Sequence, residues 1–184
     1  KNIIDCLLSQ EAVESLPSEE SLPTIVMTKF PPKLVINKKE IELQNTEFCY
    51  YFYFLQRAKQ EMEFKNLKEE NNPEYNKKDT KFEKENYPRI CSEFIGAIID
   101  LYTEIFKSDD SNSDIKNKFF NDRTTPLIKQ TLAPHISRIN SKIKKNLKMK
   151  VDTELLELVL IKHRKYTDEY GIELPSFKID IEIN

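Results

Sequence analysis

Residues 125–148 decide the fold of this chain, and they read TPLIKQTLAPHISRINSKIKKNLK. Pro134 lies in the middle of this stretch. Inside a helix it would remove a hydrogen bond and clash with the carbonyl of Gln130, at a cost of about 3 kcal/mol. A helix that ends near Gln130, followed by one that Thr131 caps, avoids this cost because proline is tolerated in a first turn. The proline therefore predicts that a long helix begins here and spans residues 132–148.

The expected helix has two different faces. The core face carries apolar side chains at helical spacing, namely Ile136, Ile139, Ile143 and Leu147. Another face carries the basic side chains Arg138, Lys142, Lys144, Lys145 and Lys148. Basic side chains along a helix neutralise phosphates, so these five are candidate nucleic-acid-binding residues. Candidates for contact with base edges are His135, Ser137, Asn140 and Ser141. The alternative is a solvated face, because in a lysine-rich chain any outer helix face is rich in lysine.

A β-hairpin is expected after this helix. Residues 155–162 form a mostly apolar run, residues 165–169 form a polar turn, and residues 170–174 form a return strand that Pro175 stops. Gly171 within the return strand predicts a bulge or a close approach of backbone. A short helix, a long helix and a two-stranded wing, in that order, are typical of a winged helix-turn-helix.

The rest of the chain supplies further elements. Period-two alternation over residues 177–183 predicts a half-buried terminal strand. Three short β-like runs are expected at residues 24–28, 34–36 and 40–43, with a hairpin turn between the last two. Helices are expected after Leu43, with Gln44 or Asn45 as the N-cap, and at residues 88–107 and 114–120.

The helix after Leu43 has an unusually wide aromatic surface. Its apolar stripe, extended by Tyr50 and Tyr53, consists of Phe48, Tyr51, Phe52, Leu55, Ala58 and Met62. A surface wider than one core stripe belongs either to the core or to a dimer interface, and both readings stay open.

These elements predict an α+β fold that is mainly α. The expected architecture is a winged helix-turn-helix with an N-terminal β-hairpin and a C-terminal wing. Residues 1–32 form an N-terminal segment and linker, and residues 33–184 form the winged-helix domain. A charged insertion at residues 63–86, rich in Lys, Glu and Asn, interrupts the domain and is expected to be a solvated connection or a partner-binding loop.

Composition excludes several classes of function. With only two glycines, the chain cannot build a phosphate-cradling loop. His135 and His163 have no metal-ligand spacing to each other or to a cysteine, and no pair of acidic residues marks an active site. We therefore expect no catalytic residue, no metal and no cofactor in this stretch. The net charge of -2 gives no global argument for nucleic acid, so any basic surface must be local.

The compartment follows from the cysteines and the apolar runs. Cys6, Cys49 and Cys91 are odd in number and far apart, which fits a reducing cytoplasm. No apolar run approaches the roughly 18 residues that a membrane span needs, so no membrane is expected. The first residue is Lys1 rather than Met, and we expect a fragment of a longer protein.

Three segments together carry a resemblance to a known family. The first is residues 34–43, LVINKKEIEL, which lead into Glu47, Phe48 and the aromatic helix. The second is residues 136–140, ISRIN, and the third is residues 170–175, YGIELP. Over roughly residues 33–183 the chain resembles the C-terminal part of CRISPR-associated proteins with an N-terminal CARF domain, the group that includes ring nucleases. Effector domains of OmpR-type response regulators share the strand–helix opening and a similar recognition helix, and they are the rival resemblance.

The resemblance implies an accessory winged-helix module in type III antiviral defence, used for dimerisation, for nucleic-acid contact through residues 132–148, or for both. It implies a homodimer. Cyclic oligoadenylate would bind only through a CARF domain, and a ring nuclease activity would belong there; the chain has no CARF-like sequence before Leu34. The rival resemblance implies a DNA-binding transcriptional effector domain.

Overall fold

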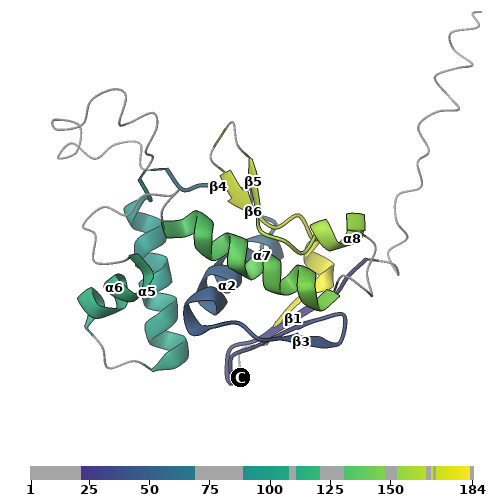
Figure 1. Ribbon diagram of the computed structural model, residues 1–184, viewed down its shortest axis with the longest axis horizontal. Helices are drawn as coiled ribbons and strands as arrows, with labels where there is room; N and C mark the ends of the chain where they lie inside the picture. The colour runs from purple at the N-terminus through teal and green to yellow at the C-terminus, as the bar shows by residue number, and fades with distance from the viewer. Residues whose placement is uncertain are drawn as a thin grey trace, which may run out of the picture.

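The computed structural model describes residues 22–68, 89–107, 111–120, 131–147, 153–164, 167 and 169–182 (Figure 1). Several expectations lie outside these residues: Lys148, the short helix before Gln130, and most of the charged insertion. The described residues form an α+β fold that contains two β-sheets and several α-helices.

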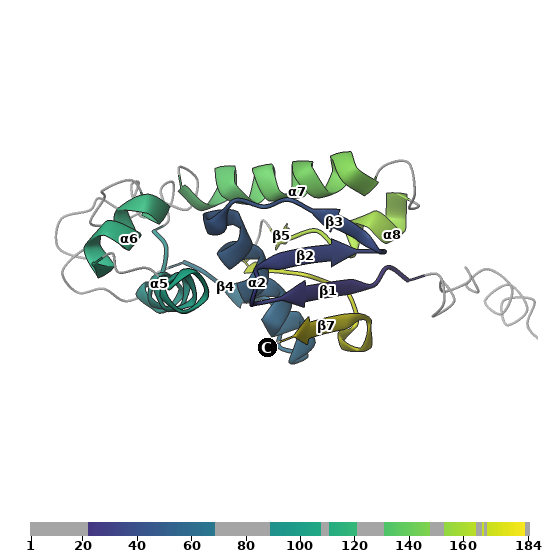
Figure 2. The same ribbon diagram turned by 90° about the horizontal axis from the view of Figure 1, so that it is seen from below.

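The larger sheet joins the beginning of the described chain to its end. Its strands are β1 (Ile25–Thr28), β2 (Lys33–Ile36), β3 (Lys39–Ile41) and β7 (Ile179–Glu182), in the order β3-β2-β1-β7. The first three strands pair antiparallel, whereas β1 and β7 are parallel. Figure 2 shows the strands following one another in this order, away from the helix α7. The expected hairpin and terminal strand are confirmed, and β1 belongs to this sheet although the sequence assigned it to the N-terminal segment.

The turn between β2 and β3 forms without glycine. Asn37 and Lys38 both have positive φ, 49° and 64°, the pair of left-handed residues that a tight hairpin turn requires. Asparagine tolerates this conformation better than most residues. The Asn37 side chain also accepts a hydrogen bond from the backbone N–H of Thr24 at 2.8 Å. The turn and the start of β1 therefore fix each other.

Helix α2 (Asn45–Lys59) begins where the sequence predicts it. Gln44 is the N-cap, and its backbone N–H donates to the carboxylate of Glu47 at 2.9 Å. The helix is buried around most of its girth, because the side chains of Tyr50, Tyr51 and Phe54 are all fully buried. The aromatic part of this surface is therefore core, whereas Met62, beyond the end of α2, is 47% exposed.

Helix α5 (Ser92–Phe106) packs along one side of α2, and α6 (Asn112–Phe120) packs against α5. The α5 helix begins at Ser92 rather than at the predicted residue 88, because Ile90 forms a β-bridge with Lys68. It ends at Lys107, whose left-handed φ of 45° stops the helix. The predicted short helix at residues 114–120 is confirmed as α6.

The smaller sheet consists of β4 (Lys65–Asn66), β5 (Lys162–Arg164) and β6 (Glu169–Gly171), in the order β4-β6-β5. All its pairs are antiparallel. Gly171 in β6 lies so close to Phe64 that a Cβ would overlap the Phe64 ring. The close backbone approach that this glycine predicts is therefore confirmed.

The first expected wing strand is wrong over most of its length. The run at residues 155–162 begins within helix α8 (Thr153–Glu157), and the strand β5 contains only residues 162–164. Short apolar runs do not distinguish a strand from a buried helix by periodicity. Here the run instead fills the core with Leu156, Val159, Leu160 and Ile161 as it turns toward the hairpin. A 3-10 turn, η3 (Ser176–Lys178), then leads into β7.

Candidate nucleic-acid interface

Helix α7 (Ala133–Leu147) carries the residues that the sequence singles out, and it confirms the predicted helix. Its apolar stripe packs toward α2 and β3. The stripe is buried throughout, with exposed fractions of 0 to 7%, and consists of Ile136, Ile139, Ile143 and Leu147. Pro134 lies in the first turn, where its missing N–H removes no helical hydrogen bond.

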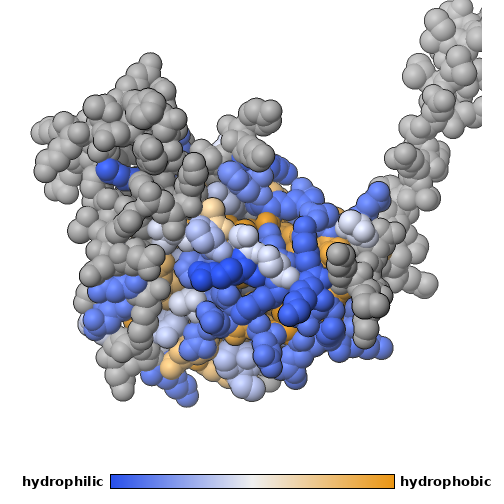
Figure 3. Space-filling model, viewed as in Figure 1, coloured by the Kyte–Doolittle hydropathy of each residue, from blue (hydrophilic) through white to orange (hydrophobic). Residues whose placement is uncertain are grey.

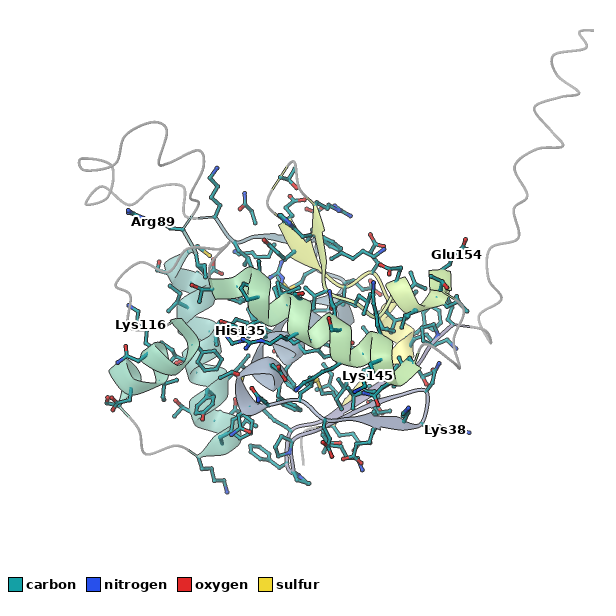
Figure 4. The ribbon with its side chains drawn as sticks, in the orientation of Figure 1. Lys38, Arg89, Lys116, His135, Lys145 and Glu154 are labelled. Carbon is teal, nitrogen blue, oxygen red and sulfur yellow. The ribbon has the colours of Figure 1, made fainter. Side chains whose placement is uncertain are left out.

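The opposite face of α7 is exposed and polar. Figure 3 views this side of the molecule and shows hydrophilic residues over the helix. His135 lies near the N-terminal end of α7 and Lys145 near the C-terminal end (Figure 4). The exposed residues of the helix between Ala133 and Leu147 are Pro134, Ser137, Arg138, Ser141, Lys144 and Lys145.

Helical spacing places Lys142 on the basic face, but its ammonium group is used in a contact with α2. Its ammonium Nζ lies 2.6 Å from a carboxylate oxygen of Glu47, whose side chain is only 2% exposed. The same Glu47 oxygen accepts the hydrogen bond from the N–H of Gln44. A buried carboxylate needs a countercharge, so Lys142 is committed to the interior contact between α7 and α2.

Lys144 is also paired within the chain. Its Nζ lies 2.9 Å from the carboxylate of Glu157 in α8, and both side chains are more than two-fifths exposed. An exposed pair of this kind is worth at most about 1 kcal/mol and is easily exchanged for another anion. Lys145 has no ion pair among the described residues, so it is the least committed lysine of the helix.

Arg138 contacts a ring instead of a carboxylate. Its Nη2 lies 2.9 Å from Nδ1 and 3.5 Å from Nε2 of His135. The His135 ring in turn contacts the ring of Tyr50, with a centroid separation of 5.1 Å. Burial, and then the charge of Arg138, lower the pKa of His135 to about 4. The imidazole is therefore neutral near pH 7.

Asn140, a candidate for base contact by its position in the sequence, has a structural role. Its amide Nδ2 donates to the carbonyl of Ile161 at 2.9 Å, and its Oδ1 accepts from the N–H of Ile161 at 3.1 Å. This two-way contact satisfies both backbone groups of the residue that precedes β5. It ties the hairpin of β5 and β6 to the middle of α7.

The hairpin adds cationic and aromatic groups that the sequence analysis did not select. The Arg164 guanidinium lies 4.1 Å from the centroid of the Phe64 ring, and it also lies 3.7 Å from the carboxylate of Glu169. The His163 ring stacks on Tyr170 across the two strands, with a centroid separation of 4.4 Å. His163 and Arg164 are both exposed. A sequence signal for His163 would need the strand register, because only the pairing shows that Tyr170 lies opposite it, and Phe64 reaches Arg164 only through the fold.

No metal site or reactive thiol is found in the described part of the chain. Among the described residues, no group of three or more His, Cys, Asp or Glu side chains has an arrangement that could hold a metal ion. Burial raises the pKa of the Cys49 thiol to about 12, so this cysteine remains protonated and unreactive. In the described part of the chain, no helix combines the length and the apolar character that a membrane crossing requires.

Of the five candidate residues, the structure leaves Arg138 and Lys145 available, pairs Lys142 and Lys144 within the chain, and does not describe Lys148. Comparisons of the chain with family models, with curated proteins and with solved structures give no match.

Proposed function

We propose that this chain is a winged-helix module that contacts nucleic acid through the exposed face of α7 and the hairpin of β5 and β6. The order of elements supports the proposal. A helix (α2) is followed by a short strand (β4), further helices that include α7 and end in the short α8, and a hairpin (β5–β6) whose return strand pairs with β4. This arrangement places the hairpin beside a helix that is buried on one face and polar on the other.

The contact between Asn140 and Ile161 carries the proposal. It fixes the start of β5 against the middle of α7, so Arg164 on the hairpin and Arg138 on the helix belong to one rigid unit. Two arginines and Lys145, spread over a helix and a hairpin, match the way in which winged helices approach a duplex. Serines at positions 137 and 141 are exposed on the same helix and provide short hydroxyl donors for phosphate or base edges.

The charge available limits the strength of this contact. With Lys142 committed to the buried Glu47, we count Arg138 and Lys145 as the phosphate-binding groups, together with Lys144 and Arg164, whose exposed ion pairs a phosphate can replace. Each neutralised phosphate contributes about -0.9 to the slope of log affinity against log salt concentration. We therefore expect weak binding that falls on the order of tenfold or more between 50 and 200 mM salt.

We propose the biological setting from the family resemblance. The chain would be an accessory module of a CRISPR-associated CARF protein in type III antiviral defence, where an upstream CARF domain would bind cyclic oligoadenylate. The alternative setting is a transcriptional effector domain of response-regulator type. A CARF-like sequence before Lys1 in the natural protein would support the first setting, and a receiver domain with a phosphorylated aspartate would support the second.

Fluorescence anisotropy with a labelled duplex DNA, at 50 and 200 mM salt, tests the interface. The variant Arg138→Gln with Lys145→Gln removes two charges from α7, and we expect it to lose most of the binding. The matched control, Lys33→Gln with Lys107→Gln, removes two charges from β2 and from the end of α5 and should bind like the original chain. Equal affinities of the two double variants would show that the basic face is solvated and has no role in binding.

Dimerisation is a second candidate, because two exposed hydrophobic side chains meet at one surface hollow. Met62 and Phe177 are the large hydrophobic side chains that are exposed among the described residues, at 47% and 59%. Both line one hollow of about 380 Å³. The other residues that line it are Ala58, Glu61, Ile172, Leu174, Pro175 and Ser176.

We propose a second copy of this chain as the partner at this hollow. A two-fold interface must be self-complementary. Here a protruding Phe177 adjoins a hollow of side-chain size, with Glu61 and Lys178 as opposite charges on the two segments that border it. Sedimentation of the chain over a concentration series tests this arrangement. Phe177→Ser should shift the chain toward monomer and Phe177→Leu should not; a chain that is monomeric at every concentration would contradict it.

A further inference from the structure

We propose that His135 is a positioning residue whose ring holds the Arg138 guanidinium in place for a phosphate group of nucleic acid. The inference rests on the proposed nucleic-acid contact and names the group that the contact recognises. It also assigns a function to a histidine for which the sequence spacing predicts no metal site.

The distances show how the guanidinium lies on the ring. The Arg138 Nη2 is 2.9 Å from Nδ1 and 3.5 Å from Nε2 of the same imidazole. A hydrogen bond in the ring plane to Nδ1 would leave Nε2 much farther away, because the two nitrogen lone pairs diverge. The guanidinium nitrogen therefore lies over the face of the ring. The contact uses one nitrogen of the guanidinium, and the N–H donors of its other nitrogens have no partner among the described residues.

The ring beneath the guanidinium is itself held firmly. His135 contacts Tyr50 at a centroid separation of 5.1 Å. Tyr50 is fully buried and lies between Phe94 and Phe119, at 5.8 and 5.5 Å. Side chains from three helices, α2, α5 and α6, thus pack on the buried side of the histidine ring and support it. The exposed guanidinium is connected to the core through two successive ring contacts.

The neutral state of His135 keeps its contact with the Arg138 guanidinium attractive. Burial and the positive charge of Arg138 both lower the pKa of the imidazole, and the distant carboxylate of Glu47 opposes them only in part. A neutral ring face attracts a cation, whereas an imidazolium would repel it. At neutral pH, the uncharged His135 ring therefore favours the contact with Arg138.

Immobilisation is what His135 contributes to binding. A free arginine side chain loses several rotatable bonds of freedom when it binds, and an arginine that is already fixed does not. A planar guanidinium with free edge donors also fits a phosphate in a bidentate manner, which an ammonium cannot do. Lys145, exposed and without a described ion pair, offers charge but not this geometry.

Duplex-DNA affinities of five forms of the full chain test the inference: the original, Arg138→Gln, His135→Ala, His135→Phe, and the double variant His135→Ala with Arg138→Gln. We expect His135→Ala to weaken binding by about two- to tenfold, the effect of freeing one side chain. His135→Phe keeps an aromatic face and should restore the affinity to within about twofold. In the Arg138→Gln background, His135→Ala should have no further effect.

The salt dependence separates positioning from loss of charge. His135→Ala keeps the charge of Arg138, so the slope of log affinity against log salt concentration should stay unchanged, while Arg138→Gln should reduce it by about 1. If Arg138→Gln weakens binding and His135→Ala does not, the inference is overturned and the proposed function stands. If Arg138→Gln leaves binding unchanged, the role of Arg138 in the proposed function fails.

A folding defect in His135→Ala would not remove the test. In that case His135→Gln, which has no ring, replaces it and is compared with His135→Phe, and thermal melts identify the forms that are folded. Weaker binding by His135→Gln than by His135→Phe supports the proposal that a ring at position 135 positions Arg138. Equal binding by these two variants overturns it.

Discussion

The carboxylate of Glu47 and the ammonium of Lys142 lie 2.6 Å apart, although they are 95 residues apart in the sequence and the Glu47 side chain is almost fully buried. The pair joins the first turn of α2 to the middle of α7. Because the same carboxylate also accepts the N–H of Gln44, the contact holds the start of one helix and the register of the other.

Lys142→Met should lower the free energy of unfolding by about 2 kcal/mol, because it leaves a buried carboxylate with only one of its partners. Urea denaturation measures this loss. Lys145→Met, on the same helix but exposed, is the matched control and should change stability by less than about 0.5 kcal/mol. If both variants unfold at the same urea concentration, the Glu47–Lys142 pair does not stabilise the fold.

Two neighbouring tyrosines should respond in opposite ways to the loss of a hydroxyl. The Tyr51 hydroxyl donates to the carbonyl of Val159 at 2.8 Å, and Tyr51→Phe should cost about 1–2 kcal/mol. The Tyr50 hydroxyl is buried and has no hydrogen-bond partner among the described residues, so Tyr50→Phe should be neutral or stabilising. Thermal melts of the two variants compare them directly. A larger loss in Tyr50→Phe would mean that its hydroxyl has a partner, such as a buried water.

The two glycines also form a matched pair. A methyl group at Gly171 would overlap the ring of Phe64, so Gly171→Ala should destabilise the chain by about 1–3 kcal/mol. Gly96 lies within α5 and a Cβ there meets nothing within 4 Å. Gly96→Ala should therefore stabilise the chain by up to about 1 kcal/mol, the difference in helix propensity. Denaturation midpoints check both signs, and a stabilised Gly171→Ala would show that Phe64 moves aside freely.

Stability should depend on pH through His135. Its pKa is lowered in the fold from 6.5 to about 4, so between these values the unfolded chain binds a proton that the folded chain does not. Stability is therefore lost as the pH falls from 6.5 to about 4. His135→Phe removes this contribution and should lose less stability over the same interval. The free energy of unfolding of each form is measured at pH 7 and at pH 4, and the two losses are compared. Acidic groups that both forms share contribute equally to the two losses and therefore cancel. An identical loss in the two forms would show that His135 is not the group responsible.

Local patterns predicted the helices well, and the reason is visible in single residues. Pro134 can be accommodated at few positions of a helix, so it set the start of α7 to within about one turn. Gln44, one of the two predicted N-caps, begins α2. Such signals depend on neighbours three or four residues away, which the sequence shows directly.

The properties of the basic helix could not be predicted in the same way, because they depend on distant partners. Helical spacing places Lys142 beside Arg138, yet only the fold shows that Glu47 neutralises it. Asn140 looks like a polar surface residue until Ile161 is placed opposite it. The apolar run before the hairpin had no periodicity to separate helix from strand, and part of it became α8.

The parallel pairing of β1 with β7 has a consequence for how the chain folds. Thr28 and Glu182, which lie opposite each other in this pair, are 154 residues apart. During synthesis, the edge of β1 that pairs with β7 therefore stays unpaired until almost the whole described chain has left the ribosome. Contacts of such long range slow folding, because a large loop must close before they form. We expect an early intermediate built around the local helices, with closure of this sheet as the late and slow step.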